Sequence, residues 1–384
     1  MRPGKLFTAA AIIICLCVFV TAQPTEPQII PEKINDNLYV LYGGNGQGAN
    51  VGLVIGDQGL LMIDSMVEAS SQKLLAAIRK ISDKPIRFVL NTHSDFDHSG
   101  GNAFFEKMGA VIISQENAKY STAKTNLTFR KDLSLKFGGD DLHAISVVSH
   151  SYDDILIFFE NANVIFMGDT YTSNYHPTFY AGGIDGQIKA LDLALSKADL
   201  KTIVVPGHGT ISAKAALEEF KKNSNDWVNR IRGLKTKKSS LESMVIDPEL
   251  NRIKTAFLRQ NPEGLSERGF SRFIERTLAS EFVKQFPIPR ADNALYTGKY
   301  EFDDQTIAEV FEVDGKLFVR KKAEFYSQIL PVSTSRFQLK GLFPEEGYFI
   351  FEAGRSLTYI VGSEQRFAKK YLKDTIAILL RDSF

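Results

Sequence analysis

Cysteine is almost absent from this sequence: only Cys15 and Cys17 occur among its 384 residues. Both lie in an apolar run, Leu6–Val20, which follows two basic residues and ends at the small residues Val20-Thr21-Ala22. This order is typical of a secretory signal peptide, so we predict that residues 1–22 are removed by cleavage after Ala22. The mature chain would then contain no cysteine. That excludes disulfides and thiolate metal ligands, and it favours an exported protein, periplasmic or secreted.

A membrane-spanning run and an excess of one charge are also missing. Leu6–Val20 is shorter than the roughly 20 apolar residues of a spanning helix, so we favour cleavage over an uncleaved anchor. No stable membrane association is expected after cleavage. The chain has 46 basic and 45 acidic residues without a long run of either, so nucleic acid is not an expected partner. Its length suits two hydrophobic cores, and the sequence leaves the oligomeric state open.

Strand-like and helix-like segments alternate between about Ile29 and Val205. Apolar periodicity predicts helices over Ala69–Ile81 and Asp185–Lys197. The predicted strands are Leu38–Tyr42, Val51–Ile55, Leu60–Ile63, Phe88–Leu90, Val111–Ile113, Ile155–Phe159 and Val164–Met167. This mixture favours an α/β fold with two sheets packed face to face and helices outside.

The remainder of the chain changes character twice. Residues 212–289 have helical spacing of apolar residues and end at Pro287-Ile288-Pro289, so we predict a helical extension. Residues 290–384 contain many short β segments, and Asp314-Gly315 is typical of a hairpin turn. We therefore predict a catalytic domain over 23–211, its helical extension over 212–289, and a small all-β, barrel-like domain over 290–384.

The glycine-rich segment Gly43–Gly48 is a possible phosphate-binding loop. A dinucleotide fingerprint follows a strand and opens a helix, whereas these glycines lie between two predicted strands. We therefore predict a hairpin loop.

Four short segments carry side chains that bind metals. The sequence has six histidines, and four of them lie in these segments. Each segment follows or closes a predicted strand, and side chains at strand ends can converge in space. Imidazoles with carboxylates suit a pair of divalent transition metals. The segments are Asn91-Thr92-His93-Ser94-Asp95-Phe96-Asp97-His98, Ser149-His150-Ser151, Met167-Gly168-Asp169-Thr170 and Pro206-Gly207-His208-Gly209.

The first segment resembles a known motif. Thr92–His98 is similar to the His-x-His-x-Asp-His motif of the metallo-β-lactamase superfamily, with His98 expected at the start of a helix that runs to Phe105. His150, Gly168-Asp169 and Gly207-His208 match the remaining motifs in order. The resemblance covers roughly residues 29–211 and implies an αβ/βα four-layer sandwich with the metals at one edge.

The resemblance also implies roles for individual residues. One metal would be held by His93, Asp95 and His150, and the second by Asp97, His98 and His208. Asp169 would bridge them. The implied cofactor is zinc, two ions per chain, and the implied nucleophile is a hydroxide between them. Asp97 would act catalytically by orienting this hydroxide towards a small-molecule substrate such as an ester, lactone, thioester or amide-like compound.

Asp95 departs from the family motif, which has histidine at this place. A carboxylate ligand is harder than imidazole and tolerates iron or manganese better. Flavodiiron-type members of the superfamily also carry a carboxylate here, so a di-iron redox enzyme is an alternative, as is a metal-containing binding protein. The chain has no flavodoxin-like segment and is predicted to be exported. We therefore favour a hydrolase.

Two features remain outside this set of ligands. Among the residues that match no ligand motif, we predict His143 to be structural, and His176, Tyr152 and Tyr175 to be candidates for the pocket wall. In the C-terminal region, Tyr296–Tyr300 and Gly315–Val319 resemble the lipocalin-like β domain of some bacterial hydrolases. Such a domain could bind an apolar ligand, shield the active-site mouth or only stabilise the fold.

Overall fold

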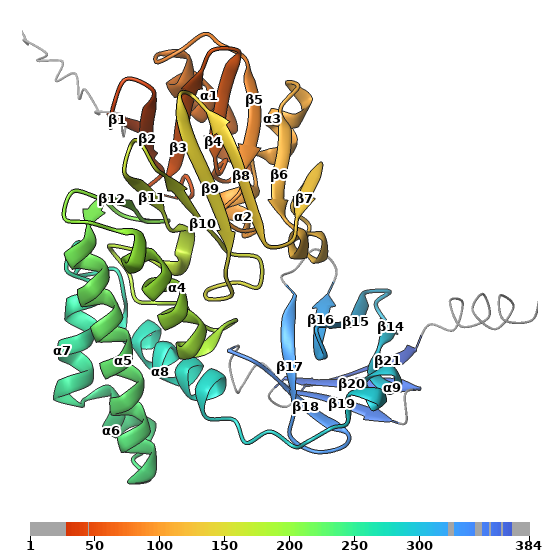
Figure 1. The fold of residues 1–384 in the computed structure, drawn as a ribbon. Coiled ribbons are helices and arrows are strands. Elements are labelled where there is room, and N and C mark those ends of the chain that lie inside the picture. The colour runs from red at the N-terminus through yellow and green to blue at the C-terminus, as the bar shows by residue number, and fades with distance from the viewer. Residues whose placement is uncertain are drawn as a thin grey trace, which may run out of the picture.

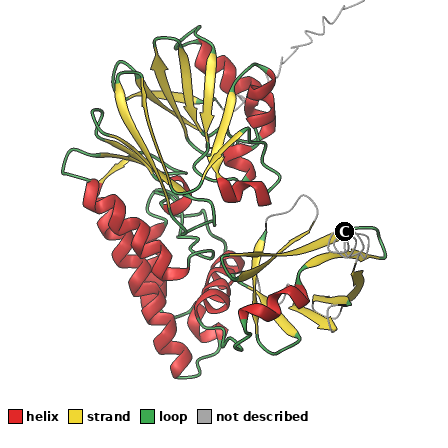
Figure 2. Ribbon diagram, turned by 45° about the vertical axis from the view of Figure 1, so that its right-hand side comes forward, coloured by secondary structure: helices red, strands yellow, loops and turns green. Residues whose placement is uncertain are grey.

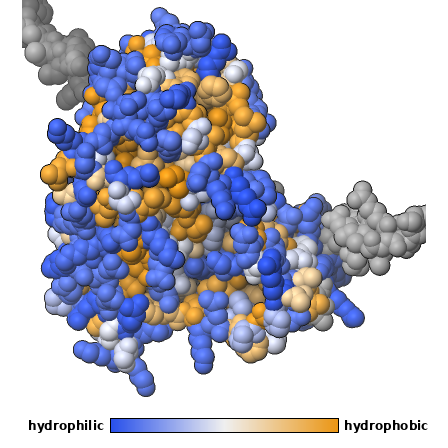
Figure 3. Space-filling model, viewed as in Figure 1, coloured by the Kyte–Doolittle hydropathy of each residue, from blue (hydrophilic) through white to orange (hydrophobic). Residues whose placement is uncertain are grey.

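The computed structural model describes residues 28–44, 46–321, 326–341, 348–352, 355–361 and 364–370. The predicted signal peptide lies outside these ranges. Within them the chain forms two sheets flanked by helices, followed by a closed barrel (Figure 1). Polar side chains cover most of the face in Figure 3, with apolar groups between them. None of the described helices is long and apolar enough to cross a membrane.

The first sheet has seven strands in sequential order. Its first four strands form antiparallel pairs, and β4 to β7 are parallel. The strands are β1 (Ile30–Lys33), β2 (Leu38–Tyr42), β3 (Val51–Gly56), β4 (Gly59–Ile63), β5 (Ile86–Leu90), β6 (Val111–Gln115) and β7 (Leu127–Phe129). The loop at Gly43–Gly48, of which Asn45 is not described, joins β2 to β3, as predicted.

The second sheet has six strands in the order β13-β12-β11-β10-β9-β8. Only the pair β11–β12 is parallel. Its strands are β8 (Asp132–Phe137), β9 (Asp140–Ser146), β10 (Ile155–Phe159), β11 (Val164–Phe166), β12 (Ile203–Val205) and β13 (Ser212–Ala213).

Strand β10 shows how the layers are held together. All five of its residues are buried. Ile155, Ile157 and Phe159 pack in the core between the two sheets. Leu156 and Phe158 point the other way, into the core beneath the helices. Because successive side chains of a strand face opposite sides, a continuous apolar run can serve two interfaces at once.

Helices cover the outer faces of both sheets, which gives the four-layer sandwich (Figure 2). The first sheet is covered by helices α1 (Ser71–Arg79) and α3 (Asn102–Lys107), through side chains such as Leu74, Ile78 and Phe105. The second sheet shares a hydrophobic core with the remaining long helices. These are α4 (Gly183–Lys197), α5 (Lys214–Thr236), α7 (Pro248–Phe257) and α8 (Glu267–Glu281), with the short α6 (Leu241–Val245) beside them.

The predicted helix from His98 to Phe105 is divided in two. Helix α2 spans Phe96–Ser99, and α3 begins at Asn102. The carbonyl of Asp97 accepts from the amide of Ala49 (2.9 Å), while the amide of Gly101 donates to Met66 (3.1 Å). The intrahelical bond from residue 101 to residue 97 is thus replaced by two tertiary bonds, and the helix is interrupted there.

The C-terminal region is a closed barrel of eight antiparallel strands, as predicted. The short helix α9 (Asn293–Tyr296) precedes it. Its strands are β14 (Gly298–Phe302), β15 (Ile307–Val313), β16 (Lys316–Lys321), β17 (Ser327–Pro331), β18 (Arg336–Leu339), β19 (Tyr348–Glu352), β20 (Ser356–Val361) and β21 (Glu364–Lys370).

Candidate metal centre

The seven predicted ligands converge at one edge of the sandwich. His93 and Asp95 follow β5, and Asp97 and His98 lie in α2. The other three follow strands of the second sheet: His150 comes after β9, Asp169 lies in the 3₁₀ turn Gly168–Thr170 after β11, and His208 follows β12. The cluster therefore draws on both sheets, at the seam where their strand ends meet.

The candidate ligand atoms form three groups, and the atoms within each group all lie within 4.8 Å of one another. In the first group, Asp95 Oδ2 lies 3.0 Å from His150 Nε2 and 3.6 Å from His93 Nε2. In the second group, which contains Asp97, His98 and His208, the atoms Asp97 Oδ2 and His208 Nε2 are 3.1 Å apart. The structure thus gathers the same two sets of three residues that the resemblance implies.

Asp169 lies between these sets. Its Oδ1 atom is 3.2 Å from His98 Nε2 and 3.4 Å from His208 Nε2. It also forms the third group, with His93 and His98. Asp169 therefore lies within reach of ligand atoms from both sets.

The buried atoms of the cluster fit a divalent cation. His93 Nε2, His98 Nε2 and Asp169 Oδ1 are buried, and none of the three has a hydrogen-bond partner among the described residues. Buried polar atoms without partners are rare in proteins because each one costs free energy. Two imidazole nitrogens and a carboxylate oxygen that face one another in this way match the ligand preferences of zinc and related metals.

Hydrogen bonds at the other ring nitrogens orient the imidazoles. His98 Nδ1 donates to Asp64 Oδ2 (2.8 Å), and His150 Nδ1 donates to the carbonyl of Thr178 (3.2 Å). His93 Nδ1 lies 3.2 Å from the hydroxyl of Thr92. A proton on Nδ1 leaves the lone pair of Nε2 directed into the cluster, which is the arrangement found behind metal-ligating histidines.

The charged groups of the cluster strongly shift one another's pKa values. Burial disfavours the charged form of His150, but its hydrogen bond to Asp95 and the charge of that carboxylate raise the pKa of His150 to about 10. Burial would likewise raise the pKa of Asp169, but the imidazoles of His208 and His98 outweigh it and hold that pKa well below its usual range. A cation that binds here must displace protons from the imidazoles, so metal affinity should rise with pH.

Asp64 is a supporting residue that the sequence analysis did not identify. It directly follows β4, has a positive φ of 64°, and is almost completely buried. Its carboxylate accepts from the amide and the hydroxyl of Thr92, both at 2.7 Å, and from His98. One carboxylate therefore fixes the loop after β5 and the tautomer of a ligand. The available signal was an aspartate that ends an apolar strand, Leu60–Ile63.

The glycine-rich loop and its neighbours hold the ligand loops together. Asn50 donates from its side chain to the carbonyls of Pro206 (3.0 Å) and Gly209 (2.9 Å), on either side of His208. A Cβ atom at Gly207 would lie only 2.1 Å from Asp169 Oδ1, so this position requires glycine. Asn50, which follows the predicted hairpin loop, and Gly207 thus help to fix the segments that carry Asp169 and His208.

The other candidates lie in different places. Tyr152 lines a pocket that opens on the cluster, as predicted, whereas His176 and Tyr175 are not among the residues that line it. His176 is buried and stacks on Phe273 with ring centroids 3.8 Å apart. His143 lies on β9, where it contacts Ser134 and Glu160, away from the cluster.

A sequence profile described as the metallo-beta-lactamase superfamily matches residues 44–208. All seven clustered residues fall within this match. Residues 44–208 are a metallo-beta-lactamase superfamily domain. The metallo-beta-lactamase fold accounts for the two sheets and their flanking helices, and the barrel follows it as a separate C-terminal unit.

Curated relatives resemble the metallo-beta-lactamase part of the chain. Metallo-beta-lactamase IND-1 of Chryseobacterium indologenes is 25% identical over 219 residues, which cover 51% of this chain and 88% of that protein. A probable hydroxyacylglutathione hydrolase of Schizosaccharomyces pombe is 26% identical over 134 residues, which cover 34% of this chain and 52% of that protein. Homologues of this domain are thus hydrolases, and their names refer to different substrates.

Among solved structures, the stereoselective inverting sec-alkylsulfatase Pisa1 from Pseudomonas sp. aligns with a TM-score of 0.53 at 15% identity. The alignment covers 69% of this chain and 53% of that one. At this identity the likeness concerns the fold alone.

Proposed function

We propose that this chain is a hydrolase that depends on two divalent cations, most naturally zinc, held by the seven clustered residues. The observation that carries the proposal is the convergence of two buried imidazole nitrogens and one carboxylate oxygen, none of which has a hydrogen-bond partner among the described residues. Without a cation the buried carboxylates are balanced only by protons on the neighbouring imidazoles, which a metal would replace. His93, Asp95 and His150 would hold one cation, and Asp97, His98 and His208 the other, with Asp169 between them.

The cations, when bound, would lower the pKa of a water molecule and polarise the oxygen of the bond to be broken. The protein's own task is then to hold ligands and water in place. Asp97 suits the orientation of that water. Burial would raise the pKa of Asp97, but its hydrogen bond to His208 and the charge of His98 lower it. The carboxylate therefore stays ionised and accepts a hydrogen bond from the attacking water.

The proposed substrate is a small ester, lactone, thioester or amide-like molecule. The two curated relatives are called a metallo-beta-lactamase and a hydroxyacylglutathione hydrolase, which supports acyl hydrolysis as a class and no single compound. Discrimination between such substrates depends on the loops around the site, which vary independently of the fold.

Metal removal and reloading test this proposal. The full chain is stripped of metal, reloaded with zinc, manganese or iron, and assayed with 4-nitrophenyl acetate, a lactone and a thioester. We expect close to two metals per chain and hydrolysis that returns with zinc or manganese. Iron loading with oxygen or peroxide turnover and no hydrolysis would favour the di-iron alternative, which the carboxylate of Asp95 makes chemically reasonable. Two bound metals without any turnover would favour a binding protein.

We also propose that the protein is exported, on the basis of the N-terminal sequence. N-terminal sequencing of protein recovered from the periplasm or the medium of a bacterial host should begin at Gln23. An intact N-terminus in the cytoplasm would contradict export.

A further inference from the structure

The barrel is docked against the catalytic domain next to the metal cluster. Tyr120 stacks on Phe311 of the barrel, with ring centroids 4.5 Å apart and an interplanar angle of 15°. Tyr152, two residues beyond His150, meets Phe318 edge to face at 4.7 Å. Arg320 of the barrel donates to the carbonyl of Tyr120 (2.8 Å). Aromatic contacts and a hydrogen bond thus join the barrel to the rest of the chain.

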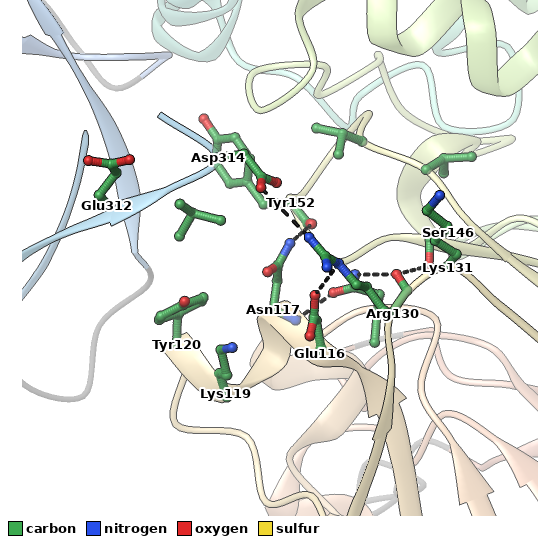
Figure 4. A pocket seen from close by; sticks show the side chains of 14 residues that line it. Glu116, Asn117, Lys119, Tyr120, Arg130, Lys131, Ser146, Tyr152, Glu312 and Asp314 are labelled. Atoms are coloured by element: carbon green, nitrogen blue, oxygen red, sulfur yellow. Dashed lines mark hydrogen bonds and ion pairs between the residues drawn. The ribbon is translucent and has the colours of Figure 1, made fainter. Parts of the chain in front are cut away.

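Three neighbouring pockets lie at this junction. One of about 510 Å³ shares Tyr152, Ala181, Tyr326 and Lys340 with the pocket at the metal cluster, but no member of the cluster is among its described lining residues. The other two differ in whether they reach the cluster. The outer one, about 570 Å³, is drawn in Figure 4. There Arg130 pairs with Glu116 (3.1 Å) and, across the junction, with Asp314 (3.9 Å). No member of the metal cluster is among its described lining residues. The outer pocket is therefore a polar part of the junction, separate from the chemistry.

The inner pocket, about 410 Å³, opens on the metal cluster. Its volume lies within the range of small-molecule binding sites. Three parts of the chain form its walls: Asp95 and His150 at the cluster, Arg276 from helix α8, and the barrel edge at β17 and β18. The barrel residues that line it are Tyr326, Ser327, Gln328, Lys340 and Gly341.

Hydrogen bonds hold this barrel edge against the catalytic domain. The amide of Lys340 donates to the carbonyl of Gln328 (2.8 Å), so these two residues lie side by side on the barrel. The hydroxyl of Tyr152 lies 3.4 Å from Gln328 Oε1. A Cβ atom at Gly341 would come within 2.3 Å of the Tyr180 side chain, which shows how closely the edge approaches. The outer wall of the pocket is therefore built by the barrel.

Lys340 brings a positive charge to this wall. Its ammonium donates to the carbonyl of Ala181 (2.9 Å) and forms no ion pair with a described carboxylate. Burial first, and then the like charge of Lys316, lower the pKa of Lys340, while the charge of Glu281 acts in the opposite direction. The other basic side chains of the described lining are Arg276 and the candidate ligand His150, and its acids are Asp95 and Asp153.

Tyr326 adds a hydrogen-bond donor to the same wall. The residue is 9% exposed, and its buried hydroxyl has no hydrogen-bond partner in the described part of the chain. Burial first, and then the negative charges of Asp153 and Asp154, raise the pKa of its phenol well above the usual range. The hydroxyl therefore remains a donor at neutral pH, and the described residues supply no acceptor for it.

We propose that the inner pocket binds the substrate of the metal centre, and that the barrel selects a substrate whose non-reacting end carries an anionic group bound by Lys340 and Tyr326. The reacting bond would lie at the end formed by Asp95 and His150. This inference rests on the proposed hydrolase function and names the chemical class of its substrate. The barrel is then a specificity element of the active site.

Matched thiols test the inference by binding, independently of turnover. The zinc-loaded full chain is titrated by calorimetry with 3-mercaptopropionate and 3-mercapto-1-propanol, which differ in a carboxylate and a hydroxymethyl group. We expect the acid to bind at least about tenfold tighter, because a charge-assisted hydrogen bond is the stronger kind. Lys340→Met should remove this preference, and Tyr326→Phe should reduce it by several-fold. Lys299→Met, an exposed barrel lysine away from the pocket, should leave it unchanged.

The possible results separate the inference from the function beneath it. Equal binding of the two thiols by the wild-type chain, or an unchanged preference in Lys340→Met, would overturn the anionic class while leaving the metal site in place. A wild-type chain that binds neither thiol would overturn the metal centre and the inference together. Metal content measured on each variant shows that Lys340→Met and Tyr326→Phe are folded at the site.

Discussion

The catalytic domain and the barrel use buried space in opposite ways. In the catalytic domain the seam between the sheets ends in a cluster of buried imidazoles and carboxylates with unpartnered atoms among the described residues. In the barrel the interior is filled by aromatic rings, among them Phe337 and Phe351, whose centroids are 5.0 Å apart. A barrel of eight strands is just wide enough to be filled by side chains. The first region thus holds buried polar groups that fit a metal, whereas the interior of the second is filled by side chains.

This difference decides among the roles expected for the lipocalin-like region. Tyr296 packs on Phe337 at 4.8 Å, and Tyr300 packs near Phe351 at 5.7 Å. The rings occupy the space in which a lipocalin-like barrel would hold an apolar ligand. The barrel instead presents its edge, at Gln328 and Lys340, to the pocket beside the metal cluster. Under our proposal, the barrel contributes to function through these residues of the pocket wall and not through its interior.

The largest effect is expected from removing a candidate metal ligand. Asp169→Ala removes the carboxylate between the two ligand sets and should abolish retention of both metals. We expect turnover to fall by at least about 100-fold, more than a change behind the ligands would cause. Elemental analysis and an ester assay measure this, with Asp141→Ala as a surface control. Full metal content and activity in Asp169→Ala would contradict the ligand assignment.

The next largest effect is expected from a cavity in the interior of the barrel. Phe337→Ala would leave a cavity in the filled interior and should destabilise the barrel by about 3–5 kcal/mol. Thermal unfolding should then show an earlier transition for the barrel, while the metal content stays at the wild-type value. Phe367→Ala is the matched control because Phe367 is exposed. Loss of metal together with barrel stability would show that the two regions do not fold independently.

A third substitution tests the metal cluster without changing a candidate ligand. Asp64→Asn keeps the shape and tolerates the positive φ at this position, but it removes the charge that orients His98. We expect metal affinity to fall by about 10–100-fold, as for other changes behind a metal-bound histidine. Competition with a metal-binding dye measures the affinity. Asp140→Asn, a buried aspartate that accepts from the amides of Asn161 and Ala162, is the control.

The smallest expected effect concerns acid stability, which should differ between the regions because all six histidines precede the barrel. Burial lowers the pKa of His176 to about 3, below the unfolded value near 6.5. The unfolded chain therefore takes up this proton first, and stability falls as the pH drops from about 6.5 towards 3. At pH 5 the cost is about 2 kcal/mol. Denaturant unfolding of His176→Phe should show a correspondingly flatter pH dependence, and an unchanged slope would contradict this account.

The sequence was most informative where apolar runs are continuous. Strand Leu38–Tyr42 was predicted with its observed bounds, and helix Asp185–Lys197 differs from α4 by two residues at its start. Three strands between Leu127 and Ser146 were not predicted. In β8 exposed residues alternate with half-buried ones over only six residues, so its hydrophobic pattern is short and weak.

By itself the sequence determined the donor chemistry, because residue type and order limit which side chains can bind a metal. It therefore indicated His93, His98 and the other candidate ligands, together with the two-sheet fold and the barrel. The tertiary structure decided what depends on contacts between distant segments. Asp64 meets His98 across 34 residues, and the barrel edge at Lys340 meets Ala181 across 159. Such contacts leave no local periodicity in the chain, so only the packed molecule shows that the barrel forms a wall of the pocket beside the metal centre.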